Sequence, residues 1–78
     1  NNKKPIDDMM DFFRYIKLNK IILDTLIHKN NKIGTILIHK KKTILLNIIT
    51  MYSKPIDIKY IRYDKKLDSF KMEIVIEI

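Results

Sequence analysis

The sequence predicts a small α+β domain in which two helices pack on one face of a three-stranded, antiparallel or mixed sheet. Two segments carry apolar residues at helical spacing, one short run is nearly all apolar and β-branched, and the end of the chain alternates apolar with polar residues. These segments follow one another in the order helix, strand, helix, strand, strand. The 78 residues contain no internal repeat and no linker, so we expect residues 1–78 to form a single domain.

The first helix is predicted from about Pro5 to Leu18. Proline suits the first position of a helix, where its missing N–H costs nothing. Asp7 and Asp8 then stand in the first turn, where the helix dipole favours negative charge. The apolar residues that follow recur at helical spacing: Met9, Met10, Phe13 and Ile16.

The next segment, from Lys20 to Lys29, fits two structures. Leu23, Leu26 and Ile27 have the spacing of a helix that continues on a rotated face. The alternative is a short strand with Ile21, Leu23 and Ile27 on one side. The helical spacing favours the helix.

The middle of the chain reads as a strand, a basic turn and a helix. The pair Asn30-Asn31 marks a loop, and the β-branched run from Ile33 to Ile38 predicts a strand. The basic turn is His39 to Lys42. A wide apolar face then predicts a helix from Thr43 to Ser53, which Pro55 cannot continue.

Beyond Pro55 the apolar period changes to two, which predicts an antiparallel hairpin around a polar turn from Asp64 to Ser69. Both apolar faces must lie against the helices, and pairing Ile58 with Ile74 achieves this. The same register sets the remaining pairs: Ile56 opposite Ile76, Tyr60 opposite Met72, and Lys59 opposite Glu73, the last a pair of opposite charges.

The composition is basic and free of cysteine. Lys and Arg outnumber Asp and Glu by 16 to 9, and this net charge of +7 favours nucleic acid or an anionic surface as partner. Without cysteine, and with His28 and His39 lacking a close carboxylate pair, we expect no metal site and no cofactor. No apolar run approaches the roughly 18 residues that span a membrane, so a membrane is not expected as partner. A small-molecule substrate is not expected either.

The best functional signal is the run Lys40-Lys41-Lys42 with its neighbour His39. Three ammonium groups beside a helix start suit the phosphates of a nucleic acid, each contact adding salt-dependent affinity. A solvated turn is the alternative interpretation. The sequence has no nucleophile elbow, no glycine-rich phosphate loop and no paired metal ligands, so we expect no enzyme.

The segment Pro5 to Met10 resembles the opening Asp-Pro-Ile-Ala-Asp-Met-Leu of the small-subunit ribosomal protein S eight family, and Arg14 falls on an arginine of that family. The segments Ile36 to Ile49 and Pro55 to Ile78 are similar to the strand, second helix and hairpin of the family's amino-terminal domain, which has the same element order. The resemblance covers nearly the whole chain but only the first half of the family's length.

The sequence departs from this family in four places. The basic turn replaces small serines, Asp11 and Phe12 replace a threonine and an arginine, and extra residues lie between the first helix and the first strand. The family's carboxy-terminal domain, with its serine- and threonine-rich RNA-contacting loop, has no counterpart here, and we expect it to be absent.

The resemblance implies a structural protein of the small ribosomal subunit that binds ribosomal RNA beside neighbouring ribosomal proteins. The expected RNA-binding residues are Lys3, Lys4, Arg14, His39, Lys40, Lys41 and Lys42. A bias towards Ile, Lys and Asn is typical of AT-rich coding and favours a mitochondrial ribosome, with a plastid or cytoplasmic ribosome as alternatives. The competing hypothesis is a free-standing basic interaction protein or regulator, viral or plasmid-borne, that binds an acidic partner. A small ribonuclease toxin is a third possibility, for which no acid–base set converges.

Overall fold

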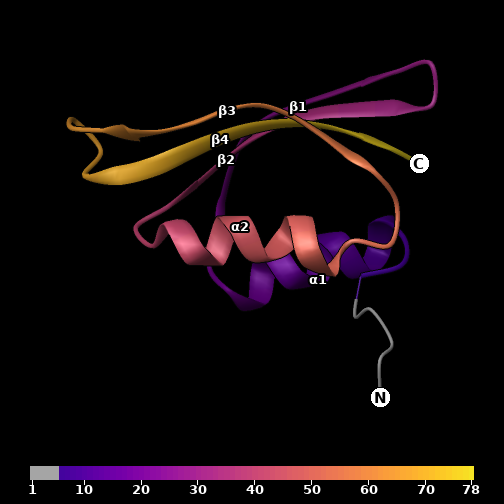
Figure 1. The fold of residues 1–78 in the computed structure, drawn as a ribbon, viewed down its shortest axis with the longest axis horizontal. Helices are drawn as coiled ribbons and strands as arrows, with labels where there is room; N and C mark the ends of the chain where they lie inside the picture. Colours follow the sequence, from indigo (N-terminus) through magenta and orange to yellow (C-terminus); the bar gives the residue numbers. More distant parts are fainter. Residues whose placement is uncertain (1–5) are drawn as a thin grey trace.

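A computed structural model describes residues 6–78 and shows two helices on one face of a four-stranded antiparallel sheet (Figure 1). The elements in chain order are α1 (Met9–Leu18), β1 (Ile22–Lys29), β2 (Lys32–His39), α2 (Lys42–Met51), β3 (Ile56–Asp64) and β4 (Ser69–Glu77). The strands lie in the sheet in the order β1-β2-β4-β3. The α+β class is therefore confirmed, while the prediction of three strands is wrong.

The additional strand comes from the ambiguous segment Lys20 to Lys29, for which the helical interpretation is wrong. β1 pairs with β2 along its whole length, and a β-bulge at Asp24 interrupts the register between Leu23 and Thr25. The buried Thr35 hydroxyl on β2 donates a hydrogen bond of 2.7 Å to the Thr25 carbonyl. The element order is therefore helix, strand, strand, helix, strand, strand.

β2, α2 and β3 form a split β-α-β unit. β2 and β3 are both antiparallel to β4, so they run parallel to each other with β4 between them. α2 crosses from one to the other over the same face of the sheet that α1 covers (Figure 1). This crossover places the start of α2 directly after the end of β2, where the basic turn lies.

The first helix begins later than predicted, at Met9. Asp8 is its N-cap residue and accepts a hydrogen bond of 2.9 Å from the Asp11 N–H, which satisfies one of the free N–H groups of the first turn. Ile6 lies before the helix and pairs with Tyr52 at the end of α2, and its carbonyl accepts from the Ser53 N–H at 2.9 Å. Pro5, the predicted first helical residue, lies outside the described residues.

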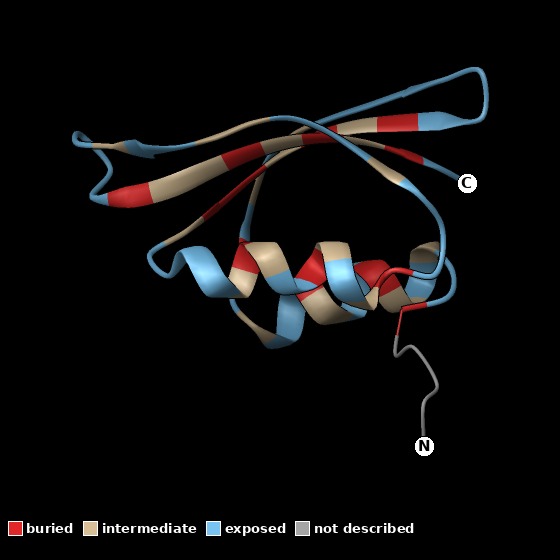
Figure 2. Cartoon of the chain, viewed as in Figure 1, coloured by how far each residue is buried: buried red, intermediate tan, exposed pale blue. Residues whose placement is uncertain are grey.

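The core lies between the helices and the inner face of the two central strands (Figure 2). Phe12 on α1 and Leu45 on α2 are fully buried, as is Ile74 on β4. The other core residues come from the helices, the loops and the central strands: Ile6, Ile16, Ile21, Ile33, Leu37, Ile48, Tyr52, Met72 and Ile76. β1, in contrast, is exposed along most of its length.

The β3–β4 hairpin has the predicted register over its first half only. Ile56 pairs with Ile76 and Ile58 with Ile74, as expected. A bulge at Lys59 then shifts the register, so that Ile61 rather than Tyr60 lies opposite Met72. The bulge turns Tyr60 to the outer face, where the Arg62 guanidinium lies 4.4 Å from the centre of its ring. The predicted pairs of Tyr60 with Met72 and of Lys59 with Glu73 are therefore both wrong, because Tyr60 faces Glu73.

Candidate nucleic-acid interface

The basic turn is a tight corner between β2 and α2. The His39 ring accepts a hydrogen bond of 2.9 Å at Nδ1 from the Lys41 N–H, which folds the chain back on itself. Lys41 is the N-cap residue of α2 and has an extended backbone, but its side chain cannot cap the helix. Lys40, Lys41 and Lys42 are all exposed, so the ammonium groups surround a helix start that lacks a side-chain cap.

Lys40 is held in place by the turn between β3 and β4. Its ammonium lies 3.3 Å from the Asp68 carboxylate and 3.3 Å from the Asp68 carbonyl oxygen. The Asp68 carboxylate also accepts a hydrogen bond from the Tyr63 hydroxyl. This hydrogen bond, and after it the contact with Lys40, lowers the pKa of Asp68 below its ordinary value. A carboxylate therefore orients Lys40 and offsets part of its charge.

A hollow of about 380 Å³ lies beside this corner, and we call it the basic hollow. Its lining joins the end of α1, the first residue of β1 and the β2–α2 corner: Lys20, Ile22, Ile38, His39, Lys40, Lys41 and Ser69. Ile38 is 5% exposed but lies on the sheet face away from the helices, so it forms an apolar floor. The arrangement places three ammonium groups and an imidazole around an apolar surface.

Lys20 is a member of this site that the sequence interpretation missed. It follows the C-cap Asn19 and has a left-handed backbone, with φ of 56°. This turn ends α1 and directs the chain into β1, which then runs antiparallel to β2. Lys20 and the basic turn are twenty residues apart in sequence and meet because β1 pairs with β2.

The positive charge is concentrated in one segment. Residues 20–42 contain six lysines and one carboxylate, Asp24, while the rest of the chain contains ten Lys or Arg and eight Asp or Glu. Five of the seven net charges therefore lie on the β1–β2 hairpin and its two ends. Lys29 and Lys32, which face each other across the hairpin, belong to this set and were also missed. Counting charges over the whole segment 20–42, rather than looking only for consecutive lysines, identifies Lys29 and Lys32.

The other predicted contacts lie apart from the basic hollow. Arg14 is on α1, where it donates to Asp11 at 2.7 Å and lines a different hollow with Ile6 and Tyr15. Lys42 begins α2 but is not part of the lining of the basic hollow. Lys3 and Lys4 lie outside the described residues.

The described part of the chain contains no group of three His, Asp or Glu side chains that could hold a metal ion. Among residues 6–78, neither helix has the length and apolar character needed to cross a membrane. Comparison with protein-family models, with curated proteins and with solved structures finds no match. The interface is therefore interpreted from its own geometry and charge.

Proposed function

We propose that this chain binds ribosomal RNA as a structural protein of the small ribosomal subunit. The observation that carries the proposal is the basic hollow, in which Lys20, Lys40 and Lys41 surround one concave surface. Ammonium groups at such a surface neutralise backbone phosphates and release counterions, which provides affinity without a catalytic step. The proposal includes no enzymatic activity and no cofactor.

The resemblance to the ribosomal protein S eight family supports the ribosomal assignment. If β1 is set aside, the remaining elements follow the order of that family's amino-terminal domain: helix, strand, helix, strand, strand. β1 comes from the segment in which this sequence has extra residues, and it adds a strand at the edge of the sheet. With the coding bias, the proposed location is a mitochondrial ribosome, where neighbouring ribosomal proteins are further partners.

A salt titration tests the RNA-binding part of the proposal. The chain is titrated against a central-domain transcript of small-subunit ribosomal RNA between about 50 and 200 mM salt. Lys40, Lys41 and Lys42 are then replaced together by Ala. We expect weaker binding and a decrease of about 2 to 3 in the slope of log affinity against log salt, one for each lost phosphate contact.

The matched control replaces Lys17, Lys54 and Lys59 by Ala. These lysines are also exposed, and the control removes the same charge from positions outside the basic hollow. Equal losses in the two triple variants would contradict the site, because affinity would then follow net charge alone. Binding of poly-glutamate as tight as that of the RNA would favour the alternative, a regulator with an acidic partner. Cosedimentation of the chain with mitochondrial small subunits tests the ribosomal assignment.

A further inference from the structure

The outer face of the sheet is the face away from the helices, and its β1–β2 half is apolar and uncovered. Ile22, Thr25 and Ile27 on β1 lie opposite Ile38, Ile36 and Gly34 on β2, and we call these six residues the hairpin face. Both helices pack on the other side of the sheet (Figure 1). Ile22 and Ile27 are 58% and 60% exposed, and nothing in the described part of the chain covers them.

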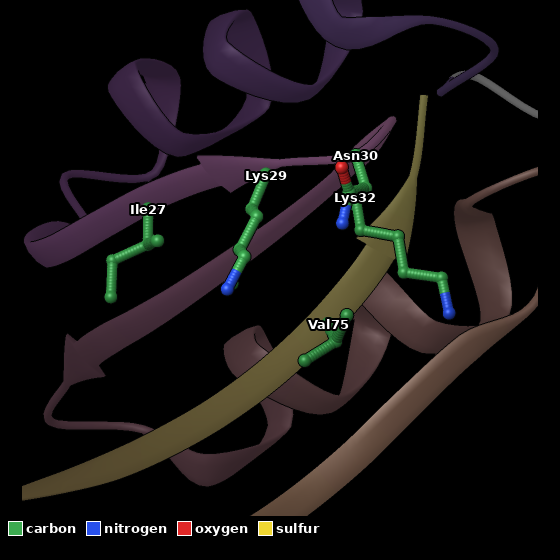
Figure 3. A pocket seen from close by; sticks show the side chains of 6 residues that line it. Ile27, Lys29, Asn30, Lys32 and Val75 are labelled. Atoms are coloured by element: carbon green, nitrogen blue, oxygen red, sulfur yellow. The ribbon is translucent and has the colours of Figure 1, made fainter.

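Each end of the hairpin face carries a hollow. The basic hollow lies at the Ile22–Ile38 pair. A second hollow, of about 370 Å³, lies at the Ile27–Gly34 pair and is also lined by Val75, Lys29, Asn30 and Lys32 (Figure 3). Ile27 lies five positions after Ile22 along β1, a distance of about 16 Å. Both hollows have an apolar floor and a rim of lysines.

The charge pattern limits which polymer fits this face. The segment that carries both hollows has six lysines and one carboxylate. The other half of the outer face has mixed charge on β3 and β4, where Arg62 and Lys71 lie among four carboxylates: Asp57, Asp64, Glu73 and Glu77. A polyanion is therefore attracted more strongly to the hairpin face than to the adjacent half of the sheet.

We propose that the hairpin face binds single-stranded RNA, with one unstacked base in each hollow and the connecting phosphates beside the lysines. This inference rests on the proposed function and adds to it the class of RNA that is bound. The apolar floors can bury the face of a base only if the base is unstacked, and a duplex keeps those faces inside its stack. The lysines at both rims then neutralise the phosphates on either side.

Gly34 keeps the second hollow open. Its backbone φ is not in the left-handed region, and a Cβ added there would lie 4.0 Å from Val75 Cγ2, an ordinary contact. A Cβ therefore fits at this position without a clash, and a larger side chain would extend into the hollow. Gly34→Val also places a residue of high strand propensity in β2, so the variant is expected to fold.

The experiment compares oligouridine about a dozen nucleotides long with an RNA duplex of equal length, both measured by fluorescence anisotropy. We expect Gly34→Val to weaken oligouridine binding by about fivefold or more and to leave duplex binding unchanged. The double variant Lys29→Gln, Lys32→Gln should lose more oligouridine affinity than Lys17→Gln, Lys54→Gln, which removes two exposed charges outside both hollows.

NMR provides a readout that needs no variant. Gly34 is the single glycine of the sequence, so its amide signal is readily assigned. It should shift on addition of oligouridine, and signals from α1 should not.

The possible failures are distinguishable. If the chain binds neither oligouridine nor the duplex, both the proposed function and this inference are overturned. If the chain binds RNA through Lys40 to Lys42, but Gly34→Val and the Lys29, Lys32 variant change oligouridine affinity no more than the control, only this inference is overturned. Tighter binding of an acidic peptide than of oligouridine would also overturn it, because the face would then fit a protein partner.

Discussion

Asp68 is a negative charge beside a site that we propose for RNA. Its backbone has a φ of 51°, a left-handed conformation that aspartate and asparagine tolerate better than most residues. This conformation brings the carboxylate to Lys40 and to the Tyr63 hydroxyl. Asp68 therefore orients one lysine of the basic hollow while it reduces the local positive potential.

The pKa of Asp68 should report its contacts with both neighbours. We expect its carboxyl group to titrate below the ordinary value of 3.8, because both Tyr63 and Lys40 favour the charged form. Tyr63→Phe and Lys40→Ala should each raise this pKa, since the hydroxyl donates the hydrogen bond that lowers it most and the ammonium lowers it through both a hydrogen bond and its charge. The contact with Lys40 contributes stability above the unfolded pKa and loses it as the pH falls through the folded pKa. Carbon-13 NMR of the side-chain carboxyl group measures each midpoint, and a midpoint at or above 3.8 in the wild type would contradict this account.

Replacing Asp68 should strengthen RNA binding. Asp68→Asn keeps the left-handed backbone accessible and removes the negative charge that offsets Lys40. We expect the affinity for RNA to rise by about threefold, the scale of one exposed charge pair. Asp57→Asn is the matched control, because Asp57 pairs with Lys59 away from the basic hollow. Equal effects of the two substitutions would mean that net charge alone is responsible.

At the scale of the element, α2 begins at a residue that is poorly suited to a helix start. Lys41 is the N-cap, and no acidic residue lies in the first turn. Serine, threonine, aspartate and asparagine are the residues that cap a helix with a side-chain oxygen. The α2 N-terminus therefore carries positive charges where stability favours an acceptor or a negative charge.

Lys41→Ser should stabilise the domain and at the same time weaken its binding to RNA. The serine hydroxyl can accept a hydrogen bond in the first turn, so the free energy of unfolding should rise by about 0.5–1 kcal/mol. RNA affinity should fall, because one ammonium of the basic hollow is lost. Lys42→Ser is the control, since it removes the same charge at the first helical position and adds no N-cap. Urea denaturation and RNA titration of both variants test the expectation. No gain in stability for Lys41→Ser relative to the control would contradict it.

The β1–β2 hairpin, which together with its two ends carries five of the seven net charges, turns on Asn30-Asn31. Both residues have positive φ, 53° and 65°, which is the geometry of a two-residue type I′ turn. Asparagine tolerates this geometry, and glycine favours it more. The turn fixes the register of β1 against β2, and so it places Lys29 opposite Lys32.

The turn can be tested by substitution at Asn31. Asn31→Gly should leave the domain as stable or slightly more stable, and Asn31→Val should lower the free energy of unfolding by about 1–2 kcal/mol because valine is strained at positive φ. Lys32→Val, on extended strand backbone, is the control for adding valine to this hairpin. If Asn31→Val were as stable as the control, the left-handed turn would be wrong.

At the scale of the whole molecule, one layer of helices covers one face of the sheet (Figure 1). A chain of this length buries only about 60% of its unfolded surface, so its core contributes a small margin of stability. The net charge of +7 adds self-repulsion, most of it in residues 20–42. Bound RNA would remove this repulsion and stabilise the folded state by mass action.

Salt should therefore act in opposite directions on stability and on binding. In low salt we expect the isolated chain to unfold over a broad range at a low Tm, and added salt should raise the Tm because it screens the self-repulsion. Salt should weaken RNA binding, because it reduces the gain from counterion release. Circular dichroism melts with and without RNA measure both effects. A sharp transition in low salt that added salt leaves unchanged would contradict this prediction.

The elements that the sequence predicts correctly are those with an unambiguous local period. α2 and the β3–β4 hairpin carry a clear helical or alternating pattern, and Pro55 separates them. The core positions of β4 follow directly from that alternation, since successive side chains of a strand point to opposite faces. The run Lys40 to Lys42 can also be recognised in the sequence, because its three lysines are consecutive.

β1 and both bulges were decided by tertiary structure. The apolar residues of Lys20 to Lys29 fit a helix and a strand, and although their spacing favours the helix, hydrogen bonding to β2 selects the strand. The bulge at Asp24 breaks the alternation, so that Ile21 is buried while Ile27 lies on the outer face. The bulge at Lys59 likewise places Ile61 opposite Met72 on the inner face, where an unbroken alternation would place Tyr60. A bulge residue cannot be recognised from the local apolar pattern, because it is defined by the pairing with the partner strand.

The same division holds for the candidate site. The sequence by itself determined that the chain is basic, that three lysines stand between a strand and a helix, and that the fold class is α+β. The pairing of β1 with β2 decided that Lys20 meets this corner, and that Gly34 and Ile27 lie together at the far end of an open face. These residues are distant in sequence, so their proximity depends on strand pairing and register, which are set by contacts between elements and not within them.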